Sequence, residues 1–294
     1  MHLIALGCLA MGVASAIIGA MIGADTVFLY MFVAFFCASV AGQLAHRVRS
    51  GRLWPAIPWR EVVTLNLATL MTFGAFYLAL VWIPASLVAG IEAAFAPLIT
   101  LFIGLRVRRR VPALTWVLAL GVLACSIAFG AAQNQALAIP GPQYITGVAL
   151  ALTAGAGMAV LALVSHRLGK RGVSAASILA VRYHLAYVVA LLLALRENPL
   201  KVGLPDLLGS LVWMVPLGIA AVVLPLFLIQ SGMMRTDPTL TTVMMAGLPA
   251  ISFLTEAILL GSRTTVASWA LLVLLVALIG TYGVIDVRRT QPRL

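Results

Sequence analysis

The sequence predicts an all-α integral membrane protein with ten transmembrane helices, and composition and patterning support this class. Of the 294 residues, 63% are hydrophobic and only 9% are charged, whereas soluble domains average about 45–50% apolar and roughly 25% charged residues. The apolar residues form runs of about the length that crosses a bilayer. Because the runs are continuous rather than alternating, a β-barrel is excluded. The same composition excludes a soluble enzyme and a disulfide-rich secreted domain.

Ten apolar runs are separated by short polar connections. Backbone exposed to lipid must satisfy its own hydrogen bonds, so we expect each run to be helical. The predicted spans are residues 3–22, 26–45, 62–81, 84–105, 113–131, 143–165, 175–195, 207–230, 239–260 and 266–285.

The basic residues test this count independently. With both termini in the cytoplasm, 15 of the 19 lysines and arginines fall in inward connections and three in outward ones, as expected when positive charge is retained inside. The inward set is Arg47, Arg49, Arg52, Arg60, Arg106, Arg108, Arg109, Arg110, Arg167, Lys170, Arg171, Arg235, Arg288, Arg289 and Arg293. The net charge of +11 therefore reflects topology, and we expect a lipid bilayer and no nucleic acid as partner.

The chain divides into two halves of five spans each. The predicted units are a first repeat at 1–131, a periplasmic linker at 132–142 and a second repeat at 143–294. Residues 84–130 and 236–283 share a layout, in which a helix with a proline (Pro97 and Pro249) is followed by a polar turn and an apolar helix. Five is odd, so the halves must be inverted in the membrane, as in many secondary transporters.

Glu92 and Arg182 are the charged side chains that lie deepest in the predicted spans. Glu92 lies about eight residues from the outer end of its span, roughly 12 Å deep. Charges at that depth are costly and mark functional sites by default. Glu92 can contact a substrate amine, couple transport to protons, form a structural ion pair, or form a hydrogen bond between helices as a neutral acid. Arg182 can hold a substrate carboxylate in a bidentate pair, or extend to the inner interface.

Aromatic side chains gather on three of the spans. Tyr77 and Tyr183 are the candidates for walls of a binding cavity, since aromatic side chains commonly line small-molecule sites. Lipid-facing and interfacial aromatics are equally ordinary in membrane proteins, so both interpretations remain open. For Glu256, which lies near the outer end of its span, we expect contact with the interface or with Arg263.

Motifs for several other chemistries are missing from the sequence. There is no G-x-x-x-x-G-K-[ST] run and no H-E-x-x-H motif. The three cysteines lie singly in apolar runs, where they behave as small buried residues. We therefore expect no metal, no cofactor and no enzymatic activity.

Short segments in both halves of the chain carry a family resemblance. They are Thr72-Phe73-Gly74-Ala75-Phe76-Tyr77, Ala85-Ser86-Leu87-Val88-Ala89-Gly90, the Pro97 segment, Leu120-Gly121-Val122, Leu179-Ala180-Val181-Arg182-Tyr183, Gly247-Leu248-Pro249 and Gly261-Ser262-Arg263-Thr264-Thr265. With these segments, the sequence resembles the drug/metabolite transporter superfamily, in particular its EamA-type exporters. This chain departs from the family where Arg106 and Ser262 stand at turns that often carry Glu. Among such exporters it looks most similar to those for amino acids, including aromatic ones.

The resemblance implies a secondary active or facilitative transporter in a bacterial inner membrane, with both termini cytoplasmic. It would export a small metabolite, most of all an amino acid, by alternating access, as a monomer or homodimer. Glu92, Tyr77, Arg182 and Tyr183 would contact the substrate, with the proton as a coupling ion at Glu92. The residues leave open an importer, a carrier of sugars, nucleotide-like solutes or cationic drugs, a membrane enzyme, and a membrane scaffold that transports nothing.

Overall fold

The computed structural model shows a bundle of helices, and no strand occurs in the residues that it describes. These are residues 2–106, 113–137, 139–196, 204–236, 238–245 and 247–290. The helices are α1 (His2–Met21), α2 (Val27–Ser50), α3 (Trp59–Thr69), α4 (Ala75–Leu80), α5 (Ala85–Arg106), α6 (Ala113–Leu137), α7 (Gly141–Lys170), α8 (Ala175–Arg182), α9 (His184–Arg196), α10 (Leu204–Gly218), α11 (Leu224–Met233), α12 (Pro238–Met245), α13 (Leu248–Ile258) and α14 (Val266–Thr290).

Several predicted spans consist of two or three consecutive helical segments. The π-helical turn η1 (Leu70–Gly74) joins α3 to α4, and a second, η3 (Ile219–Val223), joins α10 to α11. A single residue, Tyr183, separates α8 from α9. Such interruptions within otherwise continuous helices often occur at functional sites.

Eight helical stretches in the described residues are long and apolar enough to cross a membrane, and two further apolar stretches, Leu248–Ile258 and Val266–Thr281, are shorter. Many large apolar side chains lie on the outside of the bundle. Val117 is 62% exposed, Val212 74% and Val273 68%, and exposure on this scale requires an apolar solvent. The chain is thus built as a multi-pass membrane protein, while the count of ten spans remains a prediction.

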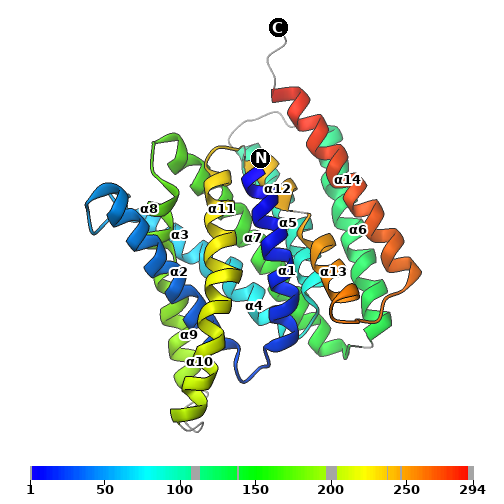
Figure 1. The fold of residues 1–294 in the computed structure, drawn as a ribbon. Coiled ribbons are helices and arrows are strands. Elements are labelled where there is room, and N and C mark those ends of the chain that lie inside the picture. The colour runs from blue at the N-terminus through cyan, green and yellow to red at the C-terminus, as the bar shows by residue number, and fades with distance from the viewer. Residues whose placement is uncertain are drawn as a thin grey trace.

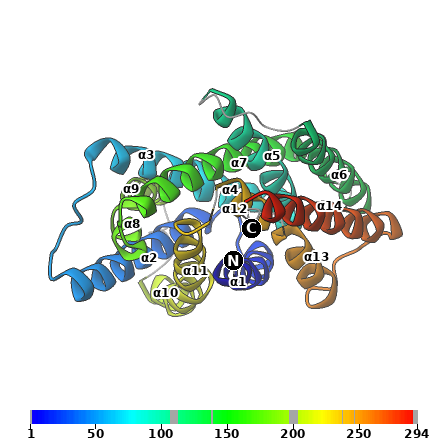
Figure 2. The ribbon, with the colours of Figure 1, turned by 90° about the horizontal axis from the view of Figure 1, so that it is seen from above.

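The helices form two rows that meet along the bundle (Figures 1 and 2). In one row α7 packs against α3, α4 and α5, and in the other α1 packs against α11 and α13. The rows are joined by α2 with α8 and α9, by α5 with α13, and by α6 with α14. Helix α1 begins and α14 ends at the same end of the bundle (Figure 1).

Small residues allow the closest helix crossings. A Cβ added at Gly42 of α2 would lie 2.7 Å from the backbone of Leu179 and Ala180 in α8, and one at Gly157 of α7 would lie 2.7 Å from the backbone nitrogen of Thr72. These contacts hold α8 and η1 close to α2 and α7. They thereby fix the two interrupted spans that carry the site described next.

Candidate functional site

Arg182 lies at the centre of a buried polar cluster where α8 packs against α11 and approaches Phe73 of η1. It is the last residue of α8 and is only 1% exposed, so its side chain does not extend to the membrane interface. Its Nη1 donates a hydrogen bond to Oε1 of Gln230 in α11, and its Nη2 donates to the Tyr183 hydroxyl at 2.5 Å. The guanidinium also lies 4.7 Å from the ring centroid of Tyr183 and 5.4 Å from that of Phe73, within range of a cation–π interaction.

No carboxylate of the described residues pairs with this guanidinium. The one ion pair among those residues joins Arg171 to Glu61 at 2.9 Å, near the surface. Burying an uncompensated charge is costly, and proteins normally offset it with a partner. Within the cluster, Nε of Arg182 and Nε2 of Gln230 are buried without a hydrogen-bond partner among the described residues. The cluster therefore carries positive charge and unused donors in the interior of the bundle.

The backbone opens beside Arg182, and Asn66 of α3 bridges the opening. In a continuous helix the amide of Leu185 would bond to the carbonyl of Val181. Here the Leu185 amide donates to Oδ1 of Asn66 at 2.9 Å, and Nδ2 of Asn66 donates to the Val181 carbonyl at 2.7 Å. One side-chain amide thus replaces a missing helical hydrogen bond, which stabilises the break between α8 and α9.

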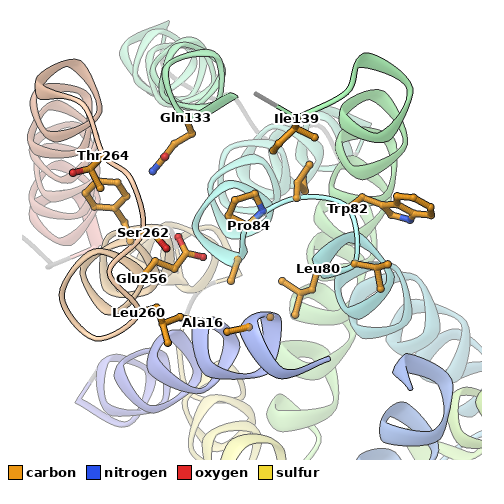
Figure 3. A pocket seen from close by; sticks show the side chains of 16 residues that line it. Ala16, Leu80, Trp82, Pro84, Gln133, Ile139, Glu256, Leu260, Ser262 and Thr264 are labelled. Carbon is orange, nitrogen blue, oxygen red and sulfur yellow. The ribbon is translucent and has the colours of Figure 1, made fainter. Parts of the chain in front are cut away.

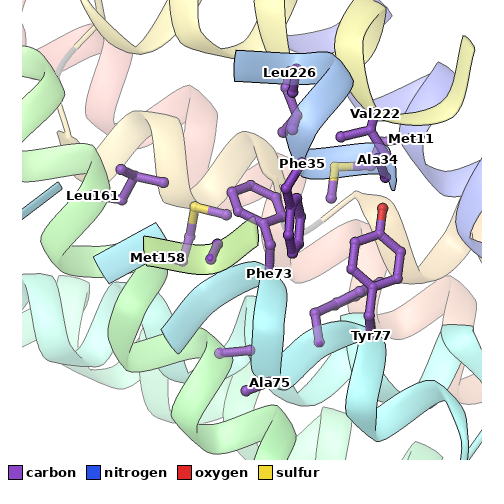
Figure 4. Close-up of a cluster of buried hydrophobic side chains, with 14 of the residues drawn as sticks. Met11, Ala34, Phe35, Phe73, Ala75, Tyr77, Met158, Leu161, Val222 and Leu226 are labelled. Carbon is purple, nitrogen blue, oxygen red and sulfur yellow. The ribbon is translucent and has the colours of Figure 1, made fainter. Parts of the chain in front are cut away.

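Aromatic rings line the same region. The ring of Tyr183 stacks on Phe35 at 5.9 Å with an interplanar angle of 13°, and Phe35 lies 5.8 Å from Tyr77. Figure 4 shows Phe35, Phe73 and Tyr77, which come from α2, η1 and α4, within one cluster of buried side chains. All of these rings are buried, so Tyr77 and Tyr183 face the interior rather than lipid. The structure therefore brings Tyr77, Arg182 and Tyr183 together.

Glu92 lies at a different level of the bundle. It is buried in α5, and its Oε2 has no hydrogen-bond partner among the described residues. Its backbone packs closely against Gly155 of α7, since a Cβ added at Gly155 would lie 2.9 Å from the Glu92 backbone oxygen. Ser165 of the same helix approaches Gln230, the partner of Arg182, at 3.5 Å. Ten residues of α-helix separate Gly155 from Ser165, about 15 Å. Glu92 is therefore not part of the Arg182 cluster.

The sequence did not single out three residues that the structure places at this site. Gln230, Ser165 and Asn66 each bond to the Arg182 cluster or to the break beside it. Asn66 and Gln230 stand as isolated amides in predicted apolar spans, 62–81 and 207–230. Isolated polar side chains inside a membrane are expensive and often functional, so this signal was present in the sequence.

Glu256 shows a different contact from the one expected. It is buried, and its carboxylate accepts hydrogen bonds from the Ser86 amide at 3.1 Å and from the Ser86 hydroxyl. The prediction that it reaches the interface or Arg263 was wrong, because the first turn of α5 offers unpaired amides and a partial positive charge nearby. Glu256 also lines a half-open pocket of about 350 Å³ with Pro84 and Ser262 (Figure 3).

Comparisons with known proteins agree with the fold. Residues 145–285 match the model of the EamA-like transporter family. A solved structure described as "Crystal structure of protein" superposes with a TM-score of 0.67 at 22% sequence identity, covering 96% of this chain and 95% of that one. No curated protein matches the sequence. The match to EamA-like transporters thus covers a domain that begins in α7 and ends in α14 and contains Arg182, Tyr183 and Gln230.

Proposed function

We propose that the chain is an EamA-type transporter that exports small metabolites, most of all amino acids, across the cytoplasmic membrane by alternating access. The observation that carries this proposal is the Arg182 cluster: a buried positive charge beside a helix break, with donors that no described residue uses. Solute sites of secondary transporters typically lie near the middle of the membrane, at interrupted helices between two repeats. The match of residues 145–285 to EamA-like transporters supports the same conclusion.

The packing of the helices supports two inverted repeats. In an inverted repeat, a contact between two spans should recur between their counterparts in the other half. The contact of α4 with α7 recurs as that of α11 with α1, and the contact of α5 with α7 recurs as that of α13 with α1. Two further contacts join a span directly to its own counterpart: α2 packs against α8 and α9, and α6 packs against α14. The π-helical turns η1 and η3 also fall in corresponding spans, the third and the eighth.

The charge distribution supports an orientation. The end of the bundle where α2 ends and α3 begins carries Arg49, Arg52, Arg60 and Arg171, and positive charge is retained on the cytoplasmic side. The pocket that contains Glu256 lies at the opposite end of these helices and would face the periplasm. Glu92, buried where α5 crosses α7, is the group that could couple transport to a proton.

Counterflow in proteoliposomes tests this function. Vesicles that contain the purified protein and an excess of one unlabelled amino acid should accumulate the labelled form transiently and saturably. Protein-free vesicles should not. The Glu92→Gln variant separates coupling from binding, because counterflow needs no net proton movement and should persist, whereas proton-driven net flux should be lost. Folded protein that exchanges no amino acid, sugar, nucleotide-like solute or organic cation would refute transport.

A further inference from the structure

The Arg182 cluster also indicates which part of a solute is recognised, an inference that rests on the proposed function. Arg182 is a donor only, whereas Gln230 offers both a donor and an acceptor. The acceptor of Gln230, Oε1, is already used by Arg182, with the Ser165 hydroxyl 3.5 Å away. The unpaired atoms, Nε of Arg182 and Nε2 of Gln230, are both donors. The missing partner must therefore bring acceptors.

The same partner must also bring negative charge. A sugar hydroxyl or an organic cation would leave the buried guanidinium uncompensated, and a cation would be repelled. A carboxylate supplies two acceptor oxygens and one charge, and it matches the planar geometry of a guanidinium. A phosphate dianion would be far harder to desolvate among the apolar neighbours of Arg182, because the cost of burial rises with charge.

The surroundings of Arg182 indicate the body of the solute. The rings of Phe73 and Tyr183 lie against the guanidinium, and Phe35 and Tyr77 pack in the same aromatic cluster. Aromatic surroundings of this kind suit a flat or bulky apolar group. No carboxylate of the described residues pairs with this cluster. The backbone of Glu92 packs at Gly155, about 15 Å along α7 from Ser165, so an amine on the solute has no assigned partner beside Arg182.

We propose that Arg182 and Gln230 bind the carboxylate of an aromatic or bulky apolar monocarboxylate, and that the α-amino group of the solute is not required. Amino acids with aromatic side chains satisfy this rule, and so do their amine-free counterparts. The proposed site therefore accepts carboxylates that have no amino group, and it excludes amines that have no carboxylate.

Three matched ligands test the rule on purified wild-type protein, by equilibrium binding or by ligand-dependent thermal stabilisation. We expect phenylalanine and 3-phenylpropionate to bind with affinities within a few-fold of each other, and phenethylamine not to bind. Binding of phenethylamine, failure of 3-phenylpropionate where phenylalanine binds, or binding of none of the three would each overturn the proposal.

A charge-specific variant tests the residues. Gln230→Glu keeps the shape of the side chain but places an internal carboxylate against Arg182, so carboxylate ligands should bind at least roughly tenfold more weakly. Gln143→Glu makes the same chemical change at an exposed site and should leave binding unchanged. Unweakened binding by folded Gln230→Glu protein would contradict the assignment. Counterflow distinguishes the two proposals, since exchange of a sugar or a cation alone would retain transport and refute only carboxylate recognition.

Discussion

At the scale of single residues, the burial of the Arg182 charge lowers the stability of the fold. A buried arginine held for structural reasons is normally paired, and removing one partner of such a pair costs about 3–5 kcal/mol. Arg182 has hydrogen bonds and ring contacts but no counter-charge among the described residues. Its burial is therefore better explained by a solute that supplies the charge.

This explanation predicts the effect of Arg182→Met. An apolar side chain of similar size in place of an uncompensated ion should leave the free energy of unfolding unchanged or raise it by about 1–4 kcal/mol, while solute exchange is lost. Thermal unfolding and counterflow on the same preparation measure both. Arg171→Met, which breaks the near-surface pair with Glu61, should change stability by less than about 1 kcal/mol. A large loss of stability in Arg182→Met would instead indicate a structural arginine.

Asn66 gives a second prediction at this scale. Asn66→Leu removes the amide that bridges the Val181 carbonyl and the Leu185 amide. The Leu185 amide would then be left unpaired, at a cost of about 1–3 kcal/mol, while the Val181 carbonyl keeps its contact with Nδ1 of His184 at 3.0 Å. Closing the break instead would shift Arg182. Either result should weaken solute binding at least roughly tenfold. Thr64→Val, which removes only a local bond to the Arg60 carbonyl, serves as the control. Unaltered binding and stability in Asn66→Leu would refute the bridging role.

At the scale of helices, α13 is tied to the start of α5 by Glu256 and Ser86. The carboxylate satisfies an amide of the first turn, where a helix presents unpaired donors and partial positive charge. A double-mutant cycle of Ser86→Ala and Glu256→Ala should give a coupling free energy of about 0.5–3 kcal/mol in thermal unfolding. Ser262→Ala combined with Ser86→Ala should be additive, since Ser262 bonds to Glu256 only through main-chain atoms. If the effects of Ser86→Ala and Glu256→Ala on the free energy of unfolding are additive, the contact between these residues does not contribute to stability.

The helices also show which structural features could be predicted from the sequence. The predicted spans begin within three residues of the helices and end within six of them, because apolar length is a strong local signal. The breaks were much less visible. Pro97 and Pro216 lie inside α5 and α10 without ending them, whereas the break at Tyr183 has neither glycine nor proline. That break depends on Asn66, more than a hundred residues away, so no local pattern could indicate it.

At the scale of the molecule, the arrangement of charge predicts the orientation. In intact cells an impermeant maleimide should label a cysteine introduced by Gln143→Cys and should not label one introduced by Arg52→Cys, since the proposed orientation puts the arginine-rich end in the cytoplasm. Both positions are exposed, so a difference in labelling reports sidedness rather than burial. The opposite pattern would invert the orientation, and equal labelling would contradict the span count between the two sites.

In the proposed transport cycle, the two halves expose the Arg182 cluster alternately to the two sides of the membrane. The most direct measurement is the rate at which an impermeant maleimide modifies Ser262→Cys, a position in the pocket that Glu256 lines (Figure 3), after Cys8, Cys37 and Cys125 are replaced by Ala. Alternating access predicts that a bound solute changes this rate, and that the change disappears when Gln230→Glu is added. A rate that is the same with and without a solute that binds the protein would contradict the account.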